Sequence, residues 1–133
     1  PTALYVSFAV DLFERGVPLH ALCHITGDGY MNLTRVEAKV GFTLDAFPEW
    51  PAVFRIIAEK GKVDAAEMYT VFNMGIGLCA ILPEKHADDV VATAKRHGFS
   101  ARKLGYATAE AGVVRIPQHG LVGRDKQLRV ERG

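Results

Sequence analysis

The sequence predicts an α+β fold in which a mostly antiparallel sheet is covered by helices. Segments with helical and strand-like patterns are mixed, without a strict β-α-β alternation and without an internal repeat. The chain has 133 residues, of which 49% are hydrophobic and 23% are charged, and this is enough for one hydrophobic core. We therefore expect a single domain that spans residues 1–133.

The first half of the chain carries recognisable signals for the ends of its elements. Thr2 is a candidate N-cap and Gly16 a stop for the first helix. Asp64-Ala-Ala-Glu67 resembles a capping box. The expected elements are a helix at 3–15, a strand at 19–25, a short helix at 30–33, a strand at 36–44, a helix at 51–61 with an apolar stripe of Val53, Phe54, Ile56 and Ile57, and a short helix at 65–72.

The second half contains the clearest helical pattern, at residues 84–97, with acidic residues first, basic residues last and Gly98 as its stop. The expected inward residues are Ala87, Val90, Val91 and Ala94. Strands are expected at 76–82, 99–107 and 112–116. Residues 117–133 are expected to form a flexible tail, because 123–132 combine four basic with two acidic residues in a solvated pattern.

Composition excludes several classes of partner. A formal net charge of +1 with interspersed signs argues against nucleic-acid or membrane-surface binding. No apolar run approaches the ~18 residues of a membrane span. Cys23 and Cys79 lie in separate apolar runs, as expected of buried free thiols in a cytoplasmic protein. Because Pro1 replaces an initiating methionine, we expect a segment excised from a longer protein.

The most informative stretch runs from His20 to Asn32, where an apolar strand leads into a Thr-Gly-Asp-Gly turn. Gly27 and Gly29 permit positive φ and close approach of a ligand, so the turn can act as a cradle for an oxyanion or a phosphate, although an ordinary turn has the same pattern. Asp28 opposes anion binding unless its carboxylate points away. His24 is a candidate general acid-base or ligand-binding residue, and a structural role is equally open.

A second glycine turn, at residues 72–78, precedes the strand expected at 76–82, and its spacing alone indicates a bend at a strand entry. The five histidines show no spacing typical of metal ligands, so no metal site is expected. Neither serine lies in a nucleophile elbow. The residues by themselves thus indicate an anion-binding loop without a complete catalytic set.

Three segments together resemble one family. They are Pro1-Thr-Ala-Leu-Tyr-Val6, His24-Ile-Thr-Gly-Asp-Gly29 with Asn32-Leu-Thr-Arg-Val36, and Glu67-Met-Tyr-Thr-Val-Phe-Asn-Met-Gly-Ile-Gly77. They are similar to the C-terminal half of aminoimidazole ribonucleotide synthetase, also called phosphoribosylformylglycinamidine cyclo-ligase, and the similarity runs to about Ile116. This resemblance implies the α+β fold of that superfamily's C-terminal domain. It also implies a part in purine biosynthesis, in which ATP activates the formyl oxygen of formylglycinamidine ribonucleotide and an internal nitrogen closes the imidazole ring.

The resemblance also implies roles for particular residues. His24, Thr26, Gly27 and Gly29 match a His-x-Thr-Gly-Gly-Gly loop, whose amides are expected to hold the substrate phosphate while His24 faces the reacting amidine. The second motif, expected to pack beside the first and to bind substrate with it, comprises Asn73, Gly75 and Gly77. Asp28 replaces the middle glycine of the loop, so its contribution to substrate binding is an open question.

Cofactors and partners follow from the same resemblance. In the full-length enzyme, ATP and Mg²⁺ are bound mainly by an N-terminal domain, which also forms most of the homodimer contact; this chain alone is expected to bind neither and to be inactive. Two alternatives stay open. One is a domain of a sister enzyme: formylglycinamidine ribonucleotide synthetase, thiamine monophosphate kinase, selenide water dikinase or the hydrogenase maturation dehydratase. The other is a non-catalytic module that binds an anion or a partner.

Overall fold

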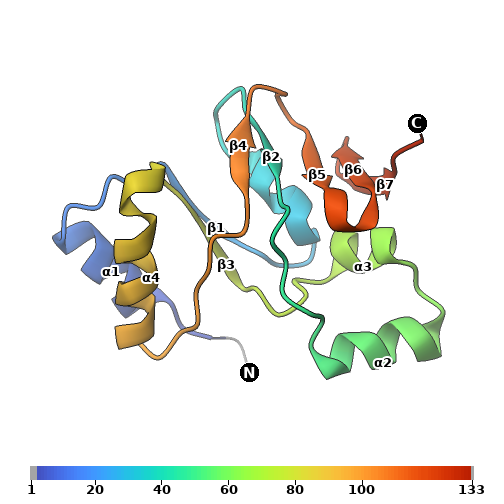
Figure 1. Ribbon diagram of the computed structural model, residues 1–133, viewed down its shortest axis with the longest axis horizontal. Coiled ribbons are helices and arrows are strands. Elements are labelled where there is room, and N and C mark those ends of the chain that lie inside the picture. The colour runs from blue at the N-terminus through green and yellow to red at the C-terminus, as the bar shows by residue number, and fades with distance from the viewer. Residues whose placement is uncertain (1–2, 133) are drawn as a thin grey trace. The chain divides into compact units, whose positions relative to one another are not determined.

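The computed structural model describes residues 3–132 and confirms the α+β class (Figure 1). Its elements are α1 (Val6–Glu14), β1 (Ala21–His24), η1 (Gly29–Arg35), β2 (Gly41–Thr43), α2 (Ala52–Gly61), α3 (Ala65–Val71), β3 (Leu78–Ile81), η2 (Glu84–His86), α4 (Ala87–Arg96), β4 (Tyr106–Thr108), β5 (Val114–Ile116), η3 (Pro117–His119), β6 (Leu121–Arg124) and β7 (Gln127–Val130). They form two compact units. Unit 1 comprises Pro1–Cys23 and Leu78–Lys103, and unit 2 comprises His24–Gly77 and Leu104–Gly133. The single domain that we expected stays a prediction.

Unit 1 consists of two helices that pack against each other and against the short β1–β3 sheet. Its core cluster of buried hydrophobic residues comprises Phe8, Leu12, Val90 and Ala94. The inward orientation predicted for Val90 and Ala94 is confirmed, whereas Ala87 and Val91 are only half-buried. The first helix begins at Val6 rather than at residue 3, and its expected cap, Thr2, lies outside the described residues.

A polar contact joins the two helices of unit 1. The Asp11 carboxylate accepts a hydrogen bond from Arg15 Nε at 2.8 Å and lies 2.8 Å from His97 Nε2, just beyond α4. The His97 hydrogen bond, followed by the Arg15 hydrogen bond, lowers the pKa of Asp11 below its ordinary value. Because His97 also packs edge-on against the Phe8 ring, at 6.0 Å between centroids, the polar and apolar contacts fix the same pair of helices.

Unit 2 contains a five-stranded sheet in the order β4-β2-β5-β6-β7. Only β2 and β5 run parallel; the other neighbouring pairs are antiparallel, as predicted. The strands are shorter than expected, since β2 covers Gly41–Thr43 rather than 36–44 and β4 covers Tyr106–Thr108 rather than 99–107. Beyond β2 the pairing continues only as single hydrogen bonds: the Leu44 amide donates to the Arg115 carbonyl of β5 at 2.8 Å, and the Ala46 amide donates to the Leu104 carbonyl at 3.1 Å.

The helices of unit 2 bear out the predicted capping but not all of the predicted burial. Asp64 caps α3, since its Oδ1 accepts a hydrogen bond from the Glu67 amide at 2.9 Å. The predicted helix is confirmed as α2, but two residues of its apolar stripe, Val53 and Ile56, are 55% and 57% exposed. Helix α2 has no buried residue, and its Phe54 ring lies 5.8 Å from the Phe72 ring between centroids.

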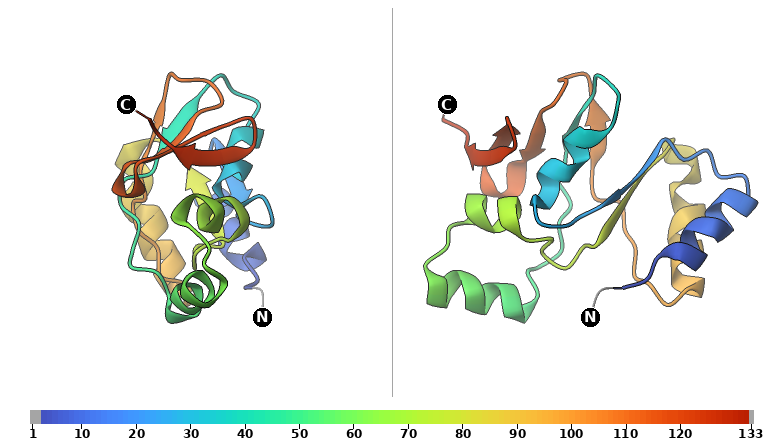
Figure 2. Two further views of the ribbon diagram at one scale, coloured as in Figure 1. Left: turned by 90° about the vertical axis from the view of Figure 1, so that its right-hand side faces the viewer. Right: turned by 180° about the vertical axis from the view of Figure 1, so that it is seen from behind.

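The tail expected at residues 117–133 is the main correction to the sequence-based fold. Residues 121–130 form the hairpin β6–β7, which adds two strands to the edge of the sheet (Figure 2). Leu121 and Leu128 point into the core and are 2% and 5% exposed. The two residues of the turn, Asp125 and Lys126, both have positive φ, as a type I′ turn requires.

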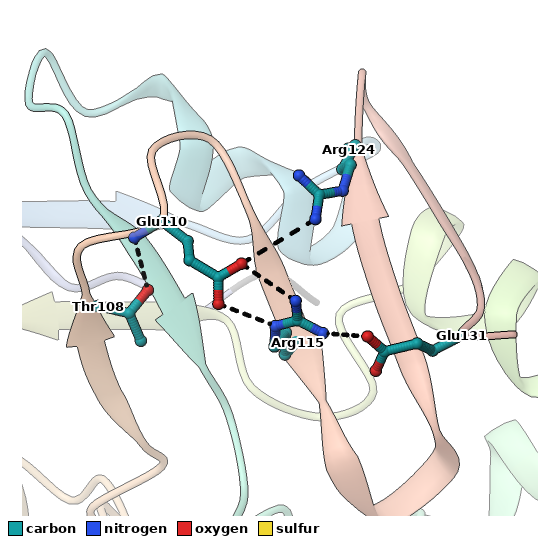
Figure 3. Close-up of polar contacts among 5 residues, drawn as sticks. All are labelled: Thr108, Glu110, Arg115, Arg124 and Glu131. Atoms are coloured by element: carbon teal, nitrogen blue, oxygen red, sulfur yellow. Dashed lines mark hydrogen bonds and ion pairs between the residues drawn. The ribbon is translucent and has the colours of Figure 1, made fainter. Parts of the chain in front are cut away.

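A charged network on the sheet surface connects this hairpin to Glu110 and to Arg115 of β5 (Figure 3). The Arg115 guanidinium donates two hydrogen bonds to Glu110, at 3.2 and 3.0 Å, and a third to Glu131, which follows β7. Arg124 lies 4.0 Å from the same Glu110 carboxylate. These bonds lower the pKa of Glu110 and raise the pKa of Arg115, so the network stays ionised at neutral pH.

Below the sheet, the aromatic side chains of unit 2 form a cluster around Tyr69, which is fully buried. Its hydroxyl accepts a hydrogen bond from Trp50 Nε1 at 2.8 Å and lies 3.2 Å from His119 Nε2. The hydroxyl proton is therefore available to donate to a neutral His119 ring. Although His119 keeps part of its surface exposed, partial burial of the ring lowers its pKa below the ordinary value of 6.5.

Acidification should destabilise the protein through His119. The unfolded chain binds the His119 proton more tightly than the folded chain, because the pKa of His119 is lower in the folded protein. The neutral ring therefore makes its full contribution to the unfolding free energy above pH 6.5. That contribution is lost as the pH falls through 6.5 towards the lower folded pKa. Urea unfolding of wild type and His119→Gln between pH 8 and 5 measures this effect. The difference in unfolding free energy between the two proteins should shrink on acidification; a constant difference would contradict the assignment.

Candidate functional site

The first glycine turn is an exposed connection between β1 and η1. Ile25 precedes it and is 1% exposed, whereas Thr26, Gly27 and Asp28 are all exposed. The Gly29 amide donates to the Thr26 carbonyl at 2.8 Å and closes the turn. The turn thus exposes three consecutive residues to solvent, while Ile25 and Gly29 on either side of them are buried.

The two glycines of this turn serve different purposes. Gly29 has φ +52°, and a Cβ atom there would lie 2.2 Å from the carbonyl oxygen of Tyr69 and 2.7 Å from that of Thr70. Any side chain at Gly29 would collide with the backbone of α3. Gly27, by contrast, has no neighbouring atom within 4 Å of its Cβ position. Gly29 is therefore required for packing, while Gly27 leaves open space at the tip of the turn.

The structure brings the two predicted glycine motifs together. The Ile25 amide donates to the Gly77 carbonyl at 2.8 Å. The Tyr30 hydroxyl donates to the Asn73 carbonyl at 2.6 Å. One bond thus precedes the first turn and the other follows it, so both ends of the first turn are attached to the second motif.

The second turn is held by its own asparagine. Asn73 Oδ1 accepts a hydrogen bond from the Gly75 amide at 2.9 Å, and the Asn73 carbonyl accepts another from Ile76 at 3.0 Å. Met74 and Gly75 have φ of 52° and 93°, which explains the glycine at the second of these positions. The Asn73 side-chain oxygen therefore shapes this turn.

Asp28, the residue that departs from the family pattern, forms an ion pair with Arg35 at the end of η1. Both side chains are more than half exposed, at 53% for Asp28 and 66% for Arg35. The carboxylate that would repel an anion thus has a guanidinium group beside it. Solvent screens such a pair, so it is weak and easily exchanged for another partner.

His24 is exposed at the end of β1, directly before the turn. Within residues 3–132, no three His, Cys, Asp or Glu side chains converge on one point that could hold a metal ion. Burial raises the pKa of the Cys23 thiol, and it raises the pKa of Cys79 to about 12, so both thiols are protonated at neutral pH. No helix in the described part of the chain is long and apolar enough to cross a bilayer.

Sequence reasoning missed the residues that hold these turns in place. Arg35 was part of a matched segment but was not expected to meet Asp28. Tyr30 is expected in a short helix, and nothing in the pattern identifies Asn73 as the partner of its hydroxyl. The one available signal is that an aromatic residue with a polar end directly follows a turn glycine.

The fold and the paired turns define an α+β domain that presents a glycine-rich, anion-compatible loop. Residues 1–117 match the family described as AIR synthase related protein, C-terminal domain, and the chain belongs to this family.

Curated relatives named phosphoribosylformylglycinamidine cyclo-ligase agree with this assignment. The relative from Methanothermobacter thermautotrophicus is 40% identical over 116 residues, which cover 87% of this chain and 33% of the relative. The relative from Thermococcus kodakarensis is 37% identical over 121 residues, covering 91% of this chain and 34% of the relative. The relative from Methanobrevibacter smithii is 43% identical over 95 residues, covering 71% and 28%. The chain thus spans about a third of the length of the curated relatives that it matches.

Substituting each glycine of the first turn by alanine should separate their roles. Gly29→Ala should lower the unfolding free energy by about 2 kcal/mol or more, because the methyl group meets the α3 backbone at a positive φ. Gly27→Ala, the matched control, should change it by less than about 0.5 kcal/mol. Urea denaturation measures both changes in unfolding free energy. Equal changes for the two variants would show that Gly29 does not pack closely against the α3 backbone.

Proposed function

We propose that the chain is the substrate-side domain of an ATP-dependent cyclo-ligase that converts formylglycinamidine ribonucleotide to aminoimidazole ribonucleotide in purine biosynthesis, and that it is inactive alone. The observation that supports this best is the pair of hydrogen bonds that joins the two glycine turns, from the Ile25 amide to Gly77 and from the Tyr30 hydroxyl to Asn73. The chain that contains them is about 40% identical to proteins named as this cyclo-ligase. Two segments far apart in sequence are joined, and each carries one exposed glycine, Gly27 and Gly75. Exposed glycines suit a ligand that needs close contact with the backbone.

Two amides of the loop are already used in hydrogen bonds, which limits the groups that the proposal can assign to a phosphate. The amides of Ile25 and Gly29 are already engaged, with Gly77 and Thr26 respectively. The proposal therefore assigns the phosphate to the exposed tip, at Thr26 and Gly27, where no atom lies within 4 Å of the Gly27 Cβ position. Arg35, paired with Asp28 beside this tip, supplies positive charge.

His24 is the proposed catalytic residue. It lies two residues before the tip, and we assign it to the reacting amidine, where its imidazole would hold or transfer a proton during ring closure. ATP supplies the phosphoryl group that turns the formyl oxygen into a leaving group. ATP, Mg²⁺ and the homodimer contact are assigned to an N-terminal domain of the longer enzyme.

The proposal predicts that the two turns respond to ligand together. In an NMR titration with formylglycinamidine ribonucleotide, or with ribose 5-phosphate, the amides of residues 25–30 and 73–77 should shift and saturate in parallel. Gly27→Val should abolish the shifts and leave the fold intact, because its side chain fills the open tip. Ala107→Val, an exposed substitution on β4, is the matched control.

Two results would contradict this assignment. Normal binding by Gly27→Val would reject the tip as the phosphate site. Shifts confined to one turn would reject the paired surface, and binding of simple anions without preference for the ribonucleotide would favour the non-catalytic module.

Asp28 should weaken the binding of phosphorylated ligands. Asp28→Asn keeps the shape of the side chain and removes a charge beside the tip, so affinity for ribose 5-phosphate should rise roughly two- to tenfold at low salt and the gain should shrink near 1 M salt. Asp45→Asn, an exposed substitution outside both turns, is the control. Isothermal titration at two salt concentrations measures the effect, and an unchanged affinity at low salt would show that Asp28 does not face the ligand.

A further inference from the structure

Helix α1 has two apolar faces, and the described residues of unit 1 cover only one of them. Phe8 and Leu12 face α4 and are 6% and 0% exposed. Val6, Val10 and Phe13 are 73%, 47% and 62% exposed. Their spacing of four and three residues places these three side chains on one stripe of the helix. A helix at the surface of a finished domain normally carries polar residues on such a face.

The sheet of unit 1 is equally incomplete. It contains two strands, β1 and β3, and neither has another neighbour among the described residues. No residue of β3 is fully buried. A two-stranded sheet is marginal without further packing. Among its described residues, unit 1 therefore has a small core and leaves the second apolar face of α1 uncovered within the unit.

The size of the uncovered stripe decides what covers it. Stable interfaces between separate proteins use roughly 20–30 residues and ~800 Å² on each side, so three side chains are too few to hold a second copy. A segment of the same polypeptide is present at an effective concentration of the order of millimolar and needs much less area. The matched region is 33% of the Methanothermobacter relative, which leaves about two thirds of that chain outside it.

We propose that Val6, Val10 and Phe13 dock an apolar segment of the longer cyclo-ligase polypeptide from outside the matched third. This inference rests on the proposed function, in which the chain acts as part of such an enzyme, and it names the surface of unit 1 that receives the remaining polypeptide. The α1 stripe, as we call these three residues, is then a contact inside the longer protein.

The test compares this chain alone with a chimera in which it replaces the matched region of the Methanothermobacter relative. Hydrogen exchange of the α1 amides should slow on the order of tenfold in the chimera. Val10→Lys should lower the Tm of the chimera by several degrees and leave the Tm of the chain alone nearly unchanged, because Val10 is partly exposed there. Ser7→Lys, at an exposed polar position of the same helix, should change neither.

Equal Tm changes for Val10→Lys in both proteins would overturn the proposal, as would unchanged α1 exchange in the chimera. A concentration-dependent dimer of the chain alone that Val10→Lys abolishes would identify a second copy as the occupant instead. If the lysine variant of the chimera does not fold, Val10→Thr provides the same comparison with an isosteric polar side chain. Ribonucleotide binding is followed in the same samples: binding without α1 protection rejects this inference alone, and α1 protection without binding rejects the proposed function alone.

Discussion

The close contact between Gly29 and the end of α3 is the constraint on which the candidate site depends. A Cβ at Gly29 would lie 2.2 Å from the Tyr69 carbonyl oxygen, so the two backbones approach more closely than any side chain allows. Because α3 leads directly into the second turn, this approach brings residue 73 within reach of the Tyr30 hydroxyl, 43 residues earlier in the chain. The paired turns are therefore a consequence of backbone packing.

The same constraint separates the parts of the first turn that carry structure from those available for chemistry. Ile25 and Gly29 use their amides to fix the base of the turn. Thr26, Gly27 and Asp28 project beyond that base and remain exposed. In the proposed function, a hydrogen-bonded base below an exposed tip lowers the cost of ordering the loop when a ligand binds. The Asp28–Arg35 pair places both signs of charge at the tip without burying either of them.

Local chemistry could be predicted from the sequence where one residue determines the outcome. Asp64 signalled the start of α3, and the glycines marked both turns. The β6–β7 hairpin could not be predicted in this way, because its turn places Asp125 and Lys126 at positive φ, where Asn-Gly or Asp-Gly is usual. The exposure of Val53 was missed for a different reason: periodicity predicts which face of a helix is apolar but not whether anything covers it. The joining of the two turns depends on long-range packing, so it could be predicted only from the family resemblance and not from local patterns in the sequence.

The hairpin also links the end of the chain to the candidate site. Thr70 of α3 accepts a hydrogen bond from the Leu128 amide, at 3.3 Å. A Cβ at Gly123 of β6 would meet Met31 of η1, so the hairpin packs against the helix that follows the first turn as well. Helix α3 thus has the Gly29 turn at its end and the hairpin along its side. Because both contacts involve α3, loss of the hairpin would loosen the helix that positions the second turn. Residues 121–130 lie outside the family match at 1–117, yet they are part of the packing that supports the site.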